Sequence, residues 1–354
     1  MCIRDRRKGQ AMKQLHFILP EVDSFISGGN LYNRYLLEAV AKMSNLSLSC
    51  FSIDKVPPSL SSLEGNFCIV DSLYLSDIAK RIATKRKEQI IYLLVHHLQS
   101  MYPEEGLDEQ ELLLQELQQL SLFDGFIVTS QYTAQYLKKH KLFQPRVVLP
   151  PVPIVEKKNN PIPRTSTPIN ALIVANLIPR KGILPFLKML KNRMAGEVLD
   201  ITITIVGETS LDGAYSKACL QYVENANELQ RIINIKGPLP PNEITTLYES
   251  SNLLISVAGF ETFGMALQEA VCYGLPILAL KGGNIENHIQ EGKNGYVFEQ
   301  LSDLVVKLIQ LTKNPSLLAN LLPSADALRN HQYPDNWKTQ AKKLVSHLSM
   351  QRGF

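Results

Sequence analysis

Residues 253–270 read LLISVAGFETFGMALQEA, and their pattern indicates a strand, a loop and a helix in succession, as in an α/β fold. The apolar residues 253–256 predict a buried strand, and the residues from about Phe263 onward have helical spacing. In an open α/β sheet, ligands bind beyond the carboxyl ends of the strands, where a helix N-terminus offers unpaired N–H groups to a phosphate. Gly264 lets the backbone approach such a group closely. We therefore predict that Phe263 and Gly264 bind a phosphorylated ligand.

Two glutamates, Glu261 and Glu269, belong to the same stretch and are separated by seven residues. Glu261 lies in the loop, where its carboxylate can accept hydrogen bonds from sugar hydroxyls. Glu269 lies about two turns along the helix, within reach of a ribose diol. The alternative is that Glu261 is a helix-start carboxylate favoured by the dipole and that Glu269 is a solvated helix residue. For one isolated glutamate, that alternative is the better interpretation.

The alternation of apolar strands and amphipathic helices extends along the whole chain. Strands without polar alternation, separated by helices, indicate parallel sheets covered on both faces. The fold class is therefore α/β, with two doubly wound, Rossmann-like domains. The strands are expected at 15–20, 67–70, 90–95, 126–128, 170–174, 200–206, 232–236, 253–256, 276–280 and 295–298.

The domain organisation follows from changes in composition. Residues 12–150 and 169–330 are expected to form the two domains, and the proline-rich segment 151–168 is expected to link them. Residues 331–354 contain the amphipathic stretch 337–348, which predicts a closing helix. Residues 1–11 are basic, lack an apolar pattern and precede a natural start at Met12, so we expect a non-native leader there.

The composition excludes several classes of protein. Apolar residues make up 45% of the 354 residues, too many for a disordered chain, and the net charge of +4 is too small and too scattered for a nucleic-acid binder. The five cysteines form no CxxC or Cys/His cluster, which favours buried free thiols in a reducing cytoplasm. No apolar run reaches the roughly 18–20 residues of a membrane span. We therefore expect a cytoplasmic protein.

Several motifs follow one another in an order that resembles glycosyltransferase family 4. Glu261 and Glu269 match the EX7E motif of that family, and its first strand and loop match VANLIPRKG at 174–182. The other matching motifs are GFETFG at 259–264, EA at 269–270, GLP at 274–276, GGNIE at 282–286 and EGKNG at 291–295. The resemblance implies the GT-B fold, in which two domains face a cleft and the last helix crosses back to the N-terminal domain.

The resemblance also implies an activity. Relatives transfer a sugar, with retention of anomeric configuration, from a nucleotide-diphosphate-sugar donor to an acceptor, here unidentified. The donor is expected on the C-terminal domain and the acceptor on the N-terminal domain. Glu261 would hold the donor sugar and Glu269 the ribose, while Phe263 and Gly264 would lie at the donor phosphates.

A basic loop at 180–182 carries the expected diphosphate site. Lys181 falls on the family lysine and would stabilise the leaving diphosphate, where charge develops as the sugar bond breaks. Asn176 stands at the position of the family arginine and carries no charge, whereas Arg180 lies beside the lysine and is the candidate to replace it. Without the neighbouring motifs, a basic surface turn would be the better interpretation.

The N-terminal half resembles the family less closely. Gly28 and Gly29 follow the first strand, much like the glycine loop near the donor phosphates, although a Gly-Gly pair is also ordinary turn chemistry. His96 ends a buried strand and matches a family histidine close to the transferred sugar; His97 is the alternative. A histidine satisfied within the domain interface is an equally weighted interpretation.

No cofactor is expected beyond the nucleotide-sugar co-substrate, and no metal, because sequences around Asp71 and Asp124 lack the paired carboxylates of a DxD site. Two alternatives stay open: a sugar-nucleotide epimerase of the same architecture, and a non-catalytic nucleotide-sugar-binding subunit. No nucleic-acid partner is expected. Peripheral contact with the inner face of a membrane is a further expectation, although a solvated helix face is the better explanation of the basic residues. They are Lys80, Arg81, Lys85, Arg86 and Lys87.

Overall fold

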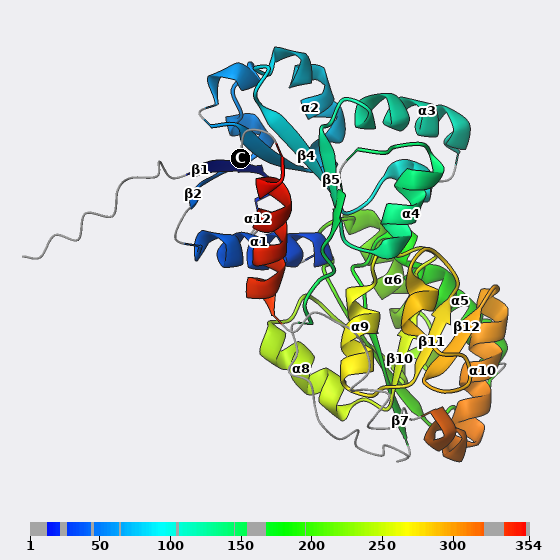
Figure 1. The fold of residues 1–354 in the computed structure, drawn as a ribbon. Helices are drawn as coiled ribbons and strands as arrows, with labels where there is room; N and C mark the ends of the chain where they lie inside the picture. Colours follow the sequence, from blue (N-terminus) through cyan, green and yellow to red (C-terminus); the bar gives the residue numbers. More distant parts are fainter. Residues whose placement is uncertain are drawn as a thin grey trace, which may run out of the picture.

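The computed structural model describes residues 13–21, 27–43, 46–63, 65–103, 106–144, 146–153, 168–194, 196–321 and 336–351. Within these residues the strands form two six-stranded sheets, and all neighbouring strands are parallel. Figure 1 shows the sheets in separate halves of the molecule, each with helices packed around it. The predicted leader, 1–11, and residues 154–167 of the predicted linker lie outside the described residues.

The first sheet has the order β2-β1-β3-β4-β5-β6. Strands β3 and β5 are buried along their whole length, as expected for strands covered on both faces. The strands are β1 (Lys13–Ile18), β2 (Leu46–Phe51), β3 (Phe67–Asp71), β4 (Ile90–Val95), β5 (Gly125–Val128) and β6 (Arg146–Val148). The helices of this half are α1 (Gly28–Ala41), α2 (Leu75–Arg81), α3 (Glu109–Leu120) and α4 (Gln131–Lys139).

The second sheet has the order β12-β11-β10-β7-β8-β9. Its strands are β7 (Ile169–Val174), β8 (Ile201–Val206), β9 (Ile233–Lys236), β10 (Leu253–Ser256), β11 (Ile277–Leu280) and β12 (Gly295–Phe298). Around it lie α5 (Ile183–Met194), α6 (Gly213–Glu224), α7 (Asn227–Gln230), α8 (Pro241–Ser250), α9 (Met265–Cys272) and α10 (Leu301–Lys313). Helices cover the sheet because its strands carry apolar side chains toward both faces.

The strand orders place the ligand side of each sheet. In the second sheet the direction of winding reverses between β7 and β10, so the loops that follow these two strands lie beside each other at the reversal. In the first sheet the reversal lies between β1 and β3. Ligands of open α/β sheets bind in the crevice at such a point.

The structure corrects four details of the sequence prediction. The helix of the opening stretch begins at Met265 and not near Phe263, because Gly264 has φ 91°, in the left-handed region. The basic residues between 80 and 87 do not share one helix face, because α2 ends at Arg81 and is followed by a 3-10 turn over Ile82–Thr84. Strands β2 and β6 were not predicted. Cys68, Cys219 and Cys272 are buried free thiols as expected, but Cys50 is exposed.

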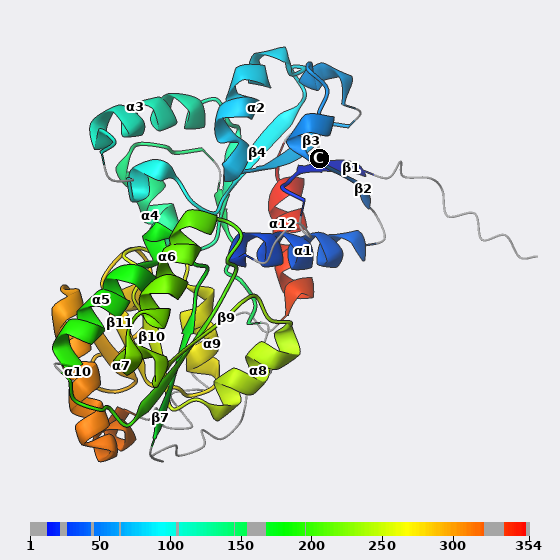
Figure 2. The ribbon, with the colours of Figure 1, turned by 180° about the vertical axis from the view of Figure 1, so that it is seen from behind.

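The C-terminal helix α12 (Trp337–Ser349) packs on the first half of the molecule, as Figure 2 shows. Its apolar face, formed by Ala341, Leu344, Val345 and Leu348, joins the hydrophobic cluster of β1 and α1. Trp337 stacks on Tyr35 and makes a T-shaped contact with Tyr32, with ring centroids 5.9 and 5.1 Å apart. The predicted return of the last helix to the first half is therefore observed, and Trp337 anchors it there.

The loop that follows β10 is held by the first half of the molecule. The Phe260 ring belongs to the hydrophobic cluster of β4 and β5 and stacks on Tyr102, with centroids 5.7 Å apart. The Ser130 hydroxyl, at the start of α4, donates to the carbonyl of Thr262 at 2.7 Å. These contacts fix the position of Glu261 relative to the carboxyl ends of both sheets.

Candidate active site

A cavity of about 470 Å³ lies between the carboxyl ends of the two sheets. Its wall comes from both halves, including the start of α1, the ends of β3 and β4, the loops after β7, β8 and β10, and the start of α9. All ten residues predicted as site residues line this one cavity: Gly28, Gly29, His96, Asn176, Arg180, Lys181, Glu261, Phe263, Gly264 and Glu269. These residues, which come from several separate segments of the chain, therefore form one candidate site.

Lys181 and Glu261 form an ion pair on the cavity wall. Lys181 ends the 3-10 turn Pro179–Lys181, which stops at Gly182 because that residue has φ 68°. Glu261 is held by its backbone, since its carbonyl accepts from Asn284 N at 2.7 Å. Burial and the adjacent Arg180 lower the pKa of Lys181, whereas Glu261 raises it. Only 15% of the Lys181 side chain is exposed, so its charge depends on the carboxylate or on an anionic ligand in its place.

Arg180 and Asn176 lie near this pair but are engaged with the backbone. Arg180 Nη1 donates to the carbonyl of Phe260 at 3.3 Å. Asn176 Oδ1 accepts from the backbone N–H of Glu208 at 3.1 Å, and thereby holds the loop after β8. Asn176 thus contributes a backbone contact rather than a charge.

Glu208 is a carboxylate of the cavity wall that sequence reasoning missed. It accepts from the N–H groups of Thr209 and Ser210, both at 2.9 Å, and these bonds lower its pKa. The signal was present, because Glu208 comes two residues after the end of β8, on the ligand side of the sheet.

The N-terminus of α9 faces the cavity through Gly264, Met265 and Ala266. The preceding carbonyl, that of Phe263, accepts from Asn284 Nδ2 at 2.8 Å and contacts His288 Nε2 at 2.6 Å. These contacts hold the turn that precedes the helix, and the first N–H groups of a helix have no partner within it. The helix therefore offers partial positive charge to an anion.

Glu269 lies on α9 and is 7% exposed. Burial raises the pKa of its carboxyl to about 7, although a hydrogen bond with Tyr248 opposes that shift. Between pH 4.5 and 7 the unfolded chain has released this proton, whereas the folded protein still holds it. The stability that this carboxyl contributes to the folded state is therefore fully present below pH 4.5 and is lost as the pH rises through 7.

We therefore expect the ligand-free protein to lose roughly 2–3 kcal/mol of stability from this group between about pH 4.5 and 7. The measurement is urea unfolding of the wild type and of Glu269→Gln at about pH 5 and pH 8. The variant lacks the titration, so the difference between the two free energies of unfolding should change by that amount. An equal difference at both pH values would contradict the buried, raised-pKa carboxyl.

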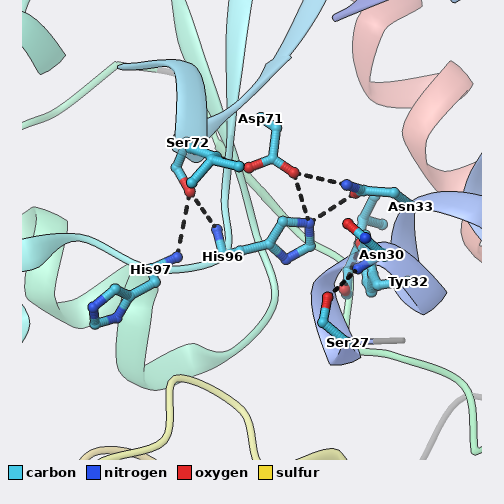
Figure 3. Close-up of polar contacts among 10 residues, drawn as sticks. Ser27, Asn30, Tyr32, Asn33, Asp71, Ser72, His96 and His97 are labelled. Carbon is cyan, nitrogen blue, oxygen red and sulfur yellow. Dashed lines mark hydrogen bonds and ion pairs between the residues drawn. The ribbon is translucent and has the colours of Figure 1, made fainter. Parts of the chain in front are cut away.

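The N-terminal wall of the cavity holds a polar network around His96 (Figure 3). His96 Nε2 lies 2.8 Å from Asn33 Oδ1 and 3.6 Å from Asp71 Oδ2. Gly29 packs against the His96 ring, since a Cβ there would lie 3.8 Å from it, and Gly28 packs against Met265 of the second half. Asp71 and Asn33 were not predicted as site residues, because they lie on different elements and only the fold brings them together.

His97 points to the opposite side of the same loop, toward the second half (Figure 3). Its ring lies 6.1 Å from that of Phe260. Burial, together with the charges of Arg180 and Lys181, lowers the pKa of His97 to about 4, although Glu261 opposes the shift. The two histidines therefore have separate surroundings: His96 belongs to the first half and His97 faces the Lys181–Glu261 pair.

The described residues contain no helix long and apolar enough to cross a membrane. Three of the five basic residues expected at a membrane have partners in the fold: Arg81 donates to Val56 O, Arg86 to Leu63 O, and Lys85 pairs with Asp124.

Within the described residues, no group of three or more His, Cys, Asp or Glu side chains is placed to hold a metal ion.

Comparison with known proteins is consistent with this geometry. Residues 155–328 match the family model for "Glycosyl transferases group 1". The chain is 24% identical to D-inositol 3-phosphate glycosyltransferase of Corynebacterium urealyticum over 42% of this chain and 34% of the relative. It is 26% identical to alpha-monoglucosyldiacylglycerol synthase of Acholeplasma laidlawii over 31% and 28% of the two chains. The chain thus spans about a third of the length of these relatives.

Two solved structures resemble the whole chain. Sucrose-phosphate synthase of Thermosynechococcus elongatus superimposes with a TM-score of 0.75 and 15% identity, over 95% of this chain and 98% of that one. Anabaena HepE, in complex with UDP and glucose, does so with a TM-score of 0.69 and 15% identity, over 96% and 100%. The chain therefore has the GT-B fold, as the resemblance in sequence implied.

Proposed function

We propose that the chain is a retaining glycosyltransferase of family 4 that uses a nucleotide-diphosphate-sugar donor. The observation that carries the proposal is the single cavity in which Lys181, Glu261, Glu269 and the N-terminus of α9 converge. The match of residues 155–328 to the group 1 glycosyltransferase family supports the same function. In this proposal, residues 12–150 bind the acceptor and residues 169–330 bind the donor.

Each element of the cavity has a part in the proposed transfer. The donor diphosphate binds at the N-terminus of α9 and at Lys181, whose charge counters the charge that develops as the sugar bond breaks. Glu261 leaves its pairing with Lys181 for the hydroxyls of the donor sugar. Glu269 accepts from the ribose, and the Arg180 guanidinium supplements Lys181 at the phosphates.

A thermal-shift panel tests donor binding, since a ligand that binds only the native state raises the apparent melting temperature. UDP-, GDP- and ADP-glucose form the panel, and we expect the UDP-sugar to give the largest increase because HepE binds UDP and glucose. Measurement of nucleoside-diphosphate release then separates a transferase from a non-catalytic binding subunit. An epimerase would instead convert the sugar without releasing the diphosphate. If no sugar nucleotide raises the melting temperature, the proposal is wrong.

We also propose that the transfer requires no metal ion, because Lys181 and the helix N-terminus supply the positive charge. Release of diphosphate should therefore be unchanged after treatment with excess EDTA and gel filtration. A matched sample to which magnesium is returned serves as the control. Activity that disappears on chelation and returns with magnesium would contradict the assignment of these groups as the main phosphate stabilisers.

A further inference from the structure

The end of β3 holds the loop after β4 in two ways. The Ser72 hydroxyl oxygen accepts from the backbone N–H groups of His96 and His97, at 3.1 and 3.3 Å. The adjacent Asp71 lies beside the imidazole of His96 itself. Asp71 and Asn33 are 3% and 1% exposed, so this network is buried within the wall of the cavity, to which Asp71 itself contributes.

The direction of each hydrogen bond follows from Asp71. As a carboxylate it can only accept, and its Oδ1 accepts from Leu73 N at 2.9 Å. Its Oδ2 lies 2.7 Å from the Asn33 side chain, which must therefore present Nδ2 to it. The remaining amide atom, Asn33 Oδ1, faces His96 Nε2 at 2.8 Å and can only accept. His96 must consequently carry a proton on Nε2.

The other ring nitrogen of His96 is then the functional one. Nδ1 has no hydrogen-bond partner among the described residues, and His96 lines the cavity. Figure 3 shows this nitrogen on the side of the ring that faces away from Asp71 and Asn33. Burial lowers the pKa of His96 more than Asp71 raises it, so the neutral ring is favoured and Nδ1 keeps its lone pair.

We infer that Asp71 and Asn33 are positioning residues that fix His96 as the Nε2–H tautomer, so that Nδ1 accepts a hydrogen bond from a hydroxyl of the substrate. The inference deepens the proposed function and rests on it for the nature of the substrate. The hydroxyl can belong to the donor sugar or to the acceptor, both of which the cavity would hold. The role is one of orientation: in the reversed tautomer Nδ1 would donate, so the substrate hydroxyl would have to accept and could no longer donate its own proton to the ring.

The tautomer can be read without any activity assay. Long-range ¹H–¹⁵N correlation spectra of histidine-labelled protein distinguish a protonated from an unprotonated ring nitrogen, and His96→Asn identifies the signal. The wild type should show Nε2–H. In Asp71→Asn the new amide can donate, which lets the Asn33 amide turn over, so the population should shift toward Nδ1–H. Asp124→Asn, a carboxylate outside the cavity that accepts from Ile91 N, is the matched control.

Turnover supplies the second readout. His96→Asn places an amide oxygen near the position of Nδ1, whereas His96→Gln places its amide near Nε2. His96→Asn should therefore keep the larger kcat/KM for UDP-glucose, and Asp71→Asn should lose at least about 10-fold, the worth of one hydrogen bond. A reversed order of the two histidine variants would overturn the inference, because it would make Nε2 the functional atom.

Addition of UDP or UDP-glucose to the labelled protein identifies the source of the hydroxyl. A change at Nδ1 with UDP-glucose but not with UDP assigns it to the donor sugar. No change with either ligand, together with the expected tautomers and the expected order of variants, assigns it to the acceptor. An Nδ1–H tautomer in the wild type overturns the inference even if the protein turns over UDP-glucose. If the protein uses no sugar nucleotide, the proposed function fails while the tautomer still decides this point.

Discussion

Lys181→Ala should lower kcat by on the order of 100-fold or more, with a smaller change in KM for the donor. The reason is that the Lys181 charge is needed most when the diphosphate leaves, whereas the N-terminus of α9 can still bind the ground-state phosphates. The measurement is steady-state kinetics of diphosphate release, with circular dichroism to verify folding.

Lys281→Ala is the matched control for this variant. Lys281 also pairs with a glutamate, Glu299, at 2.8 Å, but it lies outside the cavity and is exposed. Its removal should change neither kcat nor KM. If Lys181→Ala folds and retains the wild-type kcat, Lys181 has no part in departure of the diphosphate.

Glu261→Ala should also lower kcat by about 100-fold, because loss of the contact that orients the reacting sugar costs alignment as well as affinity. It also leaves the Lys181 ammonium without its partner in a site that is largely buried. Glu261→Gln keeps a hydrogen-bond acceptor for the sugar hydroxyls but not the charge, so its kcat should lie between those of the wild type and the alanine variant.

The double variant separates the two roles of Glu261. If Glu261 affects kcat only by holding Lys181 in place, then the double variant Lys181→Ala/Glu261→Ala should be no slower than Lys181→Ala alone. If Glu261 also orients the sugar, the double variant should be slower. A Glu261→Ala enzyme that raises KM alone would contradict both roles, since it would indicate a contact made equally in the ground and transition states.

Much of the fold could be predicted because its strands are continuous apolar runs. β4 and β7 lie within a residue of the predicted positions, and the reversal of strand order then follows from the architecture. β2 escaped prediction because it alternates polar and apolar residues at the edge of its sheet, and β6 because it has only three residues. Neither has the signature of a strand buried on both faces.

Site residues that belong to a sequence motif could be predicted, whereas residues that only the tertiary structure brings together could not. Glu261 and Lys181 were proposed from separate motifs, but their ion pair joins residues 80 positions apart and depends on β7 lying beside β10. Asn33, Asp71 and His96 lie on α1, β3 and the loop after β4, so no local pattern links them. The roles of Asn176 and Arg180 likewise depend on backbone atoms that sequence patterns do not locate.

Release of nucleoside diphosphate and formation of a glycosylated product, measured together by mass spectrometry, test the central proposal most directly. The protein would be incubated with UDP-, GDP- and ADP-glucose and an extract of bacterial lipids and glycans as acceptors, with Lys181→Ala in parallel. The proposal predicts that one donor yields diphosphate and product in equal amounts with the wild type, and little of either with the variant. A wild-type protein that binds a sugar nucleotide in the thermal-shift panel yet releases no diphosphate from it would contradict transfer and identify a non-catalytic binding protein.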